Sequence, residues 1–159
     1  MADKMVKESV WDYPRPPRVE PVSSHIVVVH DGVEIVSTNS AVRVLETSHP
    51  PTYYLPIADF IDGVLIPVTR NTVCEFKGTA SYFDLMISGQ RLDRAAWTYE
   101  NPANGFESLA GKIALYASRV DLCQVGDETV IPQEGDFYGG WITRNIEGPF
   151  KGAPGTAGW

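Results

Sequence analysis

The chain has 159 residues, of which 43% are hydrophobic and 21% charged, a composition typical of one globular domain with a real core. Its formal charge of -7 and pI of about 4.9 exclude the basic surface that binds a nucleic-acid backbone. No apolar run is long enough to cross a bilayer, and the first residues lack the apolar stretch of a signal peptide. We therefore expect a cytoplasmic protein without nucleic-acid or membrane partners.

Residues 1–24 are predicted to form an extended arm on a single domain that spans residues 25–159. Prolines between positions 14 and 17 follow Trp11 and Tyr13, and each proline fixes its own backbone and restricts the residue before it. The two aromatic side chains would anchor the arm on the domain. A proline-spaced segment of this kind can also serve as a ligand for another protein.

Two hairpins are predicted from β-branched runs on either side of a turn. His25–His30 and Val33–Val36 flank Asp31-Gly32, and Val120–Val125 is followed by Glu128–Ile131 after Gly126-Asp127. Further strands are expected over 95–99 and 112–117. His25 and His30 fall on opposite faces of their strand, so they are poor candidates for ligands of one metal.

Between the hairpins, Thr38-Asn39-Ser40 is predicted to cap a short helix over Ala41–Glu46. Arg43 and Glu46 would lie three residues apart on its outer side, where they could pair. Prolines then end the helix, and a helical turn is expected over 56–61. Glu46 and His49 could form an acid–base pair, although a histidine beside prolines is often an ordinary loop residue.

The segment from Cys74 to Asp84 is predicted to be one strand that carries a site. Alternation would place Glu75, Lys77 and Thr79 on one face of it. A polar row within a chain of core-forming segments faces a pocket, an ordered polar network or solvent. Glu75 and Lys77 favour the pocket because they can hold each other ionised, while the alternative is an exposed face with an ordinary ion pair.

Aromatic side chains are the second component of the predicted site. Trp97 and Tyr99 share a face of their strand, where they either form core or stack on a flat substrate. The C-terminal segment 132–159 combines aromatic residues with seven of the chain's 14 glycines, and we expect it to fold onto the domain and to help close the pocket.

No Cys/His cluster has the spacing of metal ligands, so neither a metal nor a cofactor is predicted. Cys74 and Cys123 are too few for a disulfide framework, although they could pair once.

Several long strings in the chain resemble those of the family called domain of unknown function 427 (DUF427). They are LETSHPPTYYLP, CEFKGTASYFD, AAWTYENP and PQEGDFYGGWITRNIEGPFKGAPGTAGW. The resemblance implies a mainly β, single antiparallel domain with one or two short helices, similar to the tent-like folds of the Mss4 and methionine-R-sulfoxide reductase group. Some relatives carry a nucleotidyltransferase label. The chain departs from the zinc-bearing tent-like proteins because it has no Cys-x-x-Cys pair, and neither cysteine has the setting of a reactive thiol.

Three functions remain open at this stage. The first is a cofactor-free enzyme that moves protons on a small organic molecule in an isomerisation, cyclisation or dehydration; the second is a binding module with the same pocket. The third is a nucleotidyltransferase, for which the upstream glycines of a phosphate cradle are missing before Lys77-Gly78-Thr79. A homodimer is also left open. The predicted catalytic residues are Glu75, Lys77, Glu46 and His49, and the predicted ligand contacts are Arg43, Tyr53, Tyr54, Thr79, Tyr82, Trp97 and Tyr99.

Overall fold

The computed structural model describes the backbone of residues 7–74, 78–133 and 139–151, and the side chains of these residues except those of 69–74 and 78. The strands are β1 (Glu8–Ser9), β2 (Arg18–Pro21), β3 (Ile26–His30), β4 (Val33–Thr38), β5 (Val42–Leu45), β6 (Thr52–Pro56), β7 (Leu65–Cys74), β8 (Gly78–Ile87), β9 (Gln90–Thr98), β10 (Lys112–Leu115), β11 (Leu122–Val125), β12 (Glu128–Thr129), β13 (Ile131–Pro132), β14 (Trp141–Ile142) and β15 (Ile146–Glu147). Four 3₁₀ segments complete the described elements: η1 (Val10–Asp12), η2 (Ile57–Asp59), η3 (Glu107–Leu109) and η4 (Ala117–Arg119).

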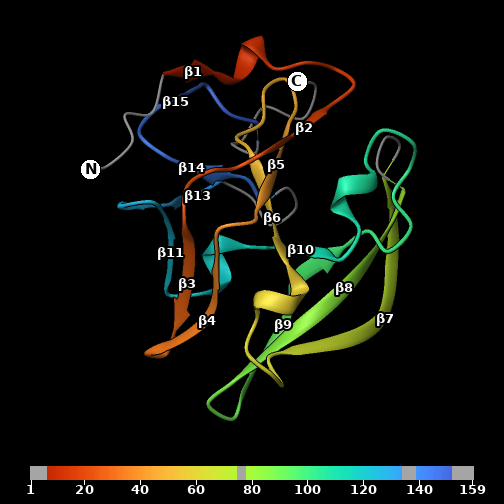
Figure 1. The fold of residues 1–159 in the computed structure, drawn as a ribbon, viewed down its shortest axis with the longest axis vertical. Helices are drawn as coiled ribbons and strands as arrows, with labels where there is room; N and C mark the ends of the chain where they lie inside the picture. The colour runs from red at the N-terminus through yellow and green to blue at the C-terminus, as the bar shows by residue number, and fades with distance from the viewer. Residues whose placement is uncertain (1–6, 75–77, 134–138, 152–159) are drawn as a thin grey trace.

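The predicted mainly β class is confirmed. Seven strands form one sheet in the order β2-β5-β6-β10-β9-β8-β7, and four form a second sheet in the order β12-β11-β3-β4 (Figure 1). Among the described strands the pairing is antiparallel apart from the parallel pair β1–β15. No helix in the described parts of the chain is long and apolar enough to span a membrane.

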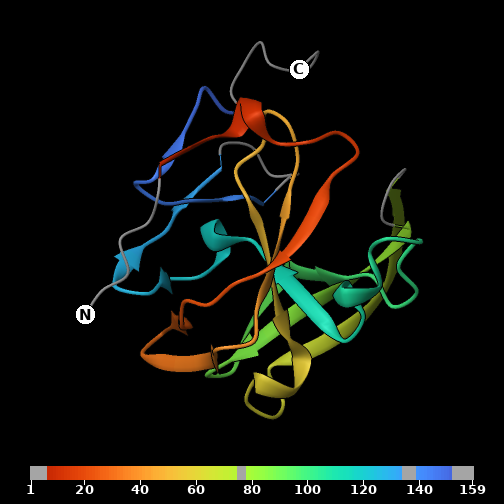
Figure 2. The same ribbon diagram turned by 45° about the horizontal axis from the view of Figure 1, so that its top comes forward.

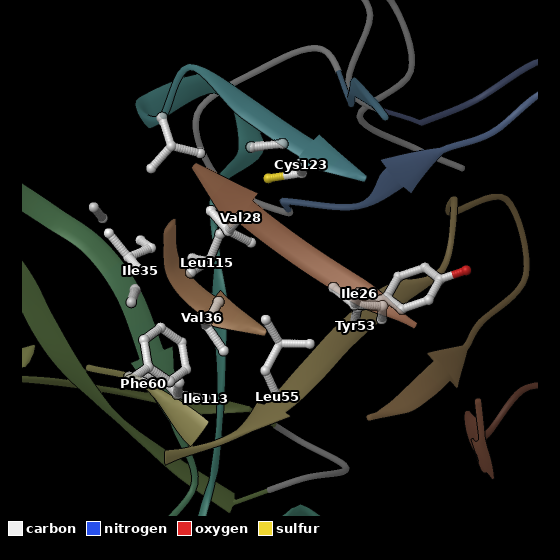
Figure 3. Close-up of a cluster of buried hydrophobic side chains, with 14 of the residues drawn as sticks. Ile26, Val28, Ile35, Val36, Tyr53, Leu55, Phe60, Ile113, Leu115 and Cys123 are labelled. Carbon is white, nitrogen blue, oxygen red and sulfur yellow. The ribbon is translucent and has the colours of Figure 1, made fainter. Parts of the chain in front are cut away.

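The main core lies between the two sheets. Val28 of β3 and Ile35 of β4 pack in the same cluster as Leu55 of β6 and Ile113 and Leu115 of β10, and all five are fully buried (Figure 3). Burying an aliphatic side chain of this size contributes about 1.5–3 kcal/mol relative to leaving it exposed. The sheets are therefore held together by apolar burial.

The two predicted hairpins are confirmed as β3–β4 and β11–β12. At the first of them, Asp31 and Gly32 have φ of 50° and 72°. Successive positive φ values are what a two-residue hairpin turn requires, and glycine and aspartate tolerate them better than most residues.

The predicted helix over 41–46 is wrong, because Val42–Leu45 form strand β5. Val42 and Val44 are β-branched and bury one face of the strand, while backbone hydrogen bonds to β2 and β6 occupy its two edges. Thr38 and Ser40, which were expected to cap this helix, take part in a turn instead. The Thr38 hydroxyl donates to Asp59 at 2.6 Å and accepts from the Ser40 amide at 3.0 Å, which fits a turn between two strands.

The prediction of one unbroken strand from Cys74 to Asp84 is also wrong. β7 ends at Cys74 and β8 begins at Gly78, and the two strands pair antiparallel with these residues opposite each other. A common face for Glu75, Lys77 and Thr79 therefore does not follow from alternation along one strand. Residues 75–77 lie outside the described part of the chain.

The first and last described segments lie together at one end of the molecule, where red and blue ribbons meet in Figure 2. Val10 and Tyr13 are buried with Leu45 and Ile146, and the Trp11 ring nitrogen donates to the Pro149 carbonyl at 2.9 Å. Tyr13 thus has the anchoring position expected from sequence, whereas the Trp11 side chain is 42% exposed.

Candidate functional site

A pocket of about 430 Å³ opens where the first strands meet strand β6 and the β14–β15 connection. We call it the Arg43 pocket. Its lining residues come from five strands, from the segment that follows β2 and from the β14–β15 connection. The strands contribute Glu8 (β1), Glu20 and Pro21 (β2), Arg43 (β5), Tyr53 (β6) and Val125 (β11), and the other two parts contribute Val22, Ser23, Ser24 and Asn145.

Arg43 occupies the pocket with two carboxylates around it. Its Nη1 and Nη2 donate to the two oxygens of Glu8, at 3.0 Å each, in a bidentate arrangement. Its Nε donates to Glu20 at 2.7 Å, and the backbone register places Glu20 directly opposite Arg43 on β2. Charge-assisted bonds of this kind are among the strongest in proteins. The predicted Arg43–Glu46 pair is replaced by these two. The predicted pair required a helix, on which residues three apart share a face, whereas Arg43 lies on strand β5 and Glu46 follows the end of that strand.

The guanidinium of Arg43 is charged although its side chain is only 15% exposed. Burial alone would lower its pKa, but the hydrogen bonds that it donates to Glu8 and Glu20 raise the pKa above the ordinary arginine value. One cation shared by two carboxylates leaves the pocket with a surplus of negative charge.

Tyr53 contributes a ring to the core and a hydroxyl to the pocket. Its ring stacks on Trp141 with the centroids 5.1 Å apart, and its hydroxyl points away from the apolar cluster in Figure 3. Burial raises the pKa of Tyr53, and the neighbouring Arg43 offsets only part of that rise. The hydroxyl is therefore protonated at neutral pH and can donate a hydrogen bond.

Tyr13 lies on the other side of Glu8. Its hydroxyl donates to Glu8 Oε2 at 3.4 Å. The side-chain amide of Asn145 donates to the other oxygen of Glu8, Oε1, at 3.4 Å. Burial, followed by the negative charge of Glu8, raises the pKa of Tyr13 above the ordinary tyrosine value. Glu8 is thus contacted by donors from three separate parts of the chain.

The predicted aromatic contacts divide between two places. Tyr54, Trp97 and Tyr99 are at most 6% exposed and belong to a second apolar cluster, which Tyr82 partly covers. There the Trp97 ring nitrogen donates to the Tyr54 hydroxyl at 3.2 Å. Trp97 and Tyr99 were expected either to form core or to stack on a flat substrate, and in the structure they are buried in an apolar core cluster. It brings only Arg43 and Tyr53 of the predicted ligand contacts into the Arg43 pocket.

Of the predicted catalytic residues, Glu46 and His49 are described by the structure and do not line this pocket. Glu46 and His49 follow β5 in a tight turn, with the His49 amide donating to the Glu46 carbonyl at 3.1 Å and its ring Nδ1 2.9 Å from the Thr47 carbonyl. Thr79 is exposed on β8. Glu75 and Lys77, the centre of the predicted site, lie outside the described residues.

Three pocket residues that bond to Arg43 or to its partner Glu8 escaped the sequence-based prediction: Glu8 itself, Glu20 and Asn145. Glu20 could have been found from the opposite charges of a cross-strand pair, had 42–45 been predicted as a strand next to 18–21. Glu8 and Asn145 carry no such signal, because they are 137 residues apart and meet only in the folded chain.

We also searched the described residues for a metal site and for a reactive cysteine. Within 7–74, 78–133 and 139–151, no three His, Cys, Asp or Glu side chains are grouped so that they could hold a metal ion. Cys123 is free and buried, and burial raises the pKa of its thiol to about 12, so it is not a reactive thiolate at neutral pH.

The chain was compared with curated proteins and with protein-family models. No curated protein matches it. One family model matches residues 18–126, a stretch that includes β2, β5 and β6 and with them Glu20, Arg43 and Tyr53. Because this match covers more than half of its length, the chain belongs to the family described as domain of unknown function (DUF427).

Proposed function

We propose that this domain binds a small organic molecule in the Arg43 pocket. The main support is that Arg43 and Tyr53 line the same cavity of about 430 Å³. Both residues were expected from sequence to contact a ligand. Pockets of roughly 300–1,000 Å³ with a few convergent polar groups are typical of small-molecule sites.

The lining offers two kinds of contact. Arg43, Glu20 and the Tyr53 hydroxyl supply donors and acceptors, while Val22 and Val125 supply apolar surface. This combination suits a molecule with a polar head and an apolar body. A compact, preformed ion-pair network would fix the orientation of the head, because Arg43 is already held in place by two partners.

Acid–base catalysis in the same pocket is the second candidate. Its support is the Tyr53 hydroxyl beside two carboxylates: the hydroxyl could donate a hydrogen bond to negative charge that develops in the transition state, and a carboxylate could accept a proton. The reaction would be an isomerisation, cyclisation or dehydration without a cofactor. The nucleotidyltransferase label remains a further alternative, although a triphosphate would meet Glu8 and Glu20 in this pocket.

A fragment titration followed by amide NMR shifts tests the binding proposal. The probes are benzoate, benzyl alcohol, benzylamine, and ATP with Mg²⁺. We expect at least one of the three aromatic probes to shift the amide signals of Val22, Ser23, Ser24 and Tyr53. A shift of the same signals by ATP alone would favour the nucleotidyltransferase alternative and count against the binding of a small organic head group.

A pair of tryptophan variants supplies the control. Ser24→Trp fills the pocket without removing any of its ion pairs, whereas Ser118→Trp places the same side chain on the exposed surface of η4. The probe-induced shifts should vanish in the first variant and persist in the second. Absence of any shift in the unsubstituted protein, or equal shifts in both variants, would rule out the Arg43 pocket as the binding site.

A further inference from the structure

Four hydrogen-bond donors converge on one carboxylate in the Arg43 pocket. Arg43 provides two of them, at 3.0 Å each, and Tyr13 and Asn145 provide one each, at 3.4 Å. They contact both oxygens of Glu8. A bidentate guanidinium flanked by two neutral donors is the donor set with which proteins recognise carboxylates.

Arg43 is held by a second partner besides Glu8. Glu20 accepts from the Arg43 Nε at 2.7 Å and lies 2.5 Å from its Nη2, and β2 and β5 are paired along their whole length. The two nitrogens that face Glu8 would therefore keep their direction if the Glu8 carboxylate left.

Glu8 itself is held by a strand pairing of only two residues. It lies on the two-residue strand β1, which pairs only with the two-residue strand β15, and its amide donates to the Asn145 carbonyl at 2.7 Å. The chain is anchored again at Val10, which is fully buried. Displacement of Glu8 would therefore break few backbone contacts, and the buried Val10 would still hold the segment that follows.

From these observations we infer that Glu8 occupies the place of a ligand carboxylate. The ligand class is a small organic acid, whose carboxylate replaces that of Glu8 on Arg43, Tyr13 and Asn145 and whose body extends into the adjoining cavity. The exchange conserves the charge around Arg43, because one carboxylate leaves as another enters. This inference rests on the proposed binding function and adds to it both the chemical class of the ligand and a contact that competes with binding.

Removing Glu8 should strengthen the binding of an external carboxylate. In Glu8→Ala, benzoate should bind at least about tenfold more tightly than in the unsubstituted protein, in line with the net strength of hydrogen bonds to charged groups. The affinity for benzyl alcohol, which has the same ring and no charge, should change little. Dissociation constants from NMR titration of the pocket amides give both values.

Glu20→Ala is the matched control, since it removes the same charge from the same arginine and leaves Glu8 in place. Its effect on benzoate binding should be several-fold smaller than that of Glu8→Ala. Equal tightening in the two variants would show a general effect of charge and overturn the inference, as would unchanged benzoate affinity in Glu8→Ala. If Glu8→Ala does not fold, Glu8→Gln serves instead, and the same comparison with Glu20→Gln decides.

The experiment also separates this inference from the proposed function. Binding of benzyl alcohol to the pocket amides without any gain for benzoate in Glu8→Ala would retain the pocket and reject the carboxylate exchange. Failure of both probes to reach these amides in every folded variant would reject both.

Discussion

Strands β5 and β6 present two different environments on their two faces. The register pairs Val42 with Tyr54 and Arg43 with Tyr53. On the first face Tyr54 is fully buried in the second apolar cluster, and its hydroxyl accepts a hydrogen bond from another buried side chain. On the second face the Tyr53 hydroxyl borders a pocket that contains a charged arginine.

The difference shows that the pairing register decides which of two neighbouring tyrosines can meet a ligand. Side chains alternate along a strand, so a shift by one residue would exchange the two environments. Residue type does not distinguish Tyr53 from Tyr54, and neither does their position in the sequence. We call the surroundings of Tyr54 the dry face. The name wet face is kept for the part of the other side around Arg43 and the Tyr53 hydroxyl, because Leu55 farther along that side packs in the main core. The following predictions test this contrast.

The largest effect is expected on the dry face. Trp97→Ala should lower the free energy of unfolding by about 3–5 kcal/mol, because it leaves a cavity among Tyr54, Tyr99 and their neighbours. Ile131→Ala, at a side chain that is 61% exposed, should change it by less than about 0.5 kcal/mol. Urea unfolding followed by circular dichroism measures both. Similar values for the two variants would show that the dry face is not a packed core.

On the wet face, Arg43→Met should cost about 1–3 kcal/mol, because it leaves Glu8 and Glu20 facing each other without the cation between them. Arg43→Lys keeps the charge but loses the bidentate arrangement, so its loss should be smaller. The same urea unfolding experiment applies. An Arg43→Met protein as stable as the unsubstituted one would mean that the ion-pair network does not contribute to the fold.

The two tyrosine hydroxyls give the most direct comparison of the faces. Tyr54→Phe removes the acceptor of the Trp97 ring nitrogen and leaves a buried donor unsatisfied, which should cost about 1–2 kcal/mol. Tyr53→Phe should cost less, about 0.5 kcal/mol, because water in the pocket can replace its hydroxyl. Thermal unfolding of the two variants side by side would reveal a reversed order, which would contradict the assignment of the faces.

The smallest effect concerns pH. Burial raises the pKa of Tyr53, and the charge of Glu8 raises it further. Because the pKa is higher in the folded than in the unfolded chain, this group contributes stability below the ordinary tyrosine value of about 10, and that stability is lost as the pH rises through the folded pKa. Tyr53→Phe should therefore make alkaline unfolding less steep.

The direction of the charge effect can be measured separately. Glu8→Gln should lower the pKa of Tyr53, since it removes one negative charge that disfavours the phenolate. A ¹³C NMR titration of the tyrosine ring signals reports the shift in each protein. A pKa that stays the same or rises in Glu8→Gln would show that Glu8 does not act on the Tyr53 hydroxyl.

Local signals in the sequence predicted a large part of the fold. The turn at Asp31-Gly32 and the β-branched runs beside it fix a hairpin through contacts a few residues apart, and this prediction is confirmed. The helix predicted for 41–46 is wrong because its capping signal is short and its β-branched residues gain more by pairing with β2 and β6. The predicted site is only partly recovered, since its centre falls at 75–77, outside the described residues.

By itself, the sequence determined that the chain forms short strands and hairpins, that Tyr13 anchors the first segment on the domain, and that Arg43 and Tyr53 are candidates for ligand contact. These properties follow from residue type and from neighbours close in the chain. The partners of Arg43 were decided by the tertiary structure alone, because Glu20 and Glu8 lie 23 and 35 residues before it. Pairing between distant strands sets which charges meet, since it depends on the burial of whole sheet faces and not on any local pattern.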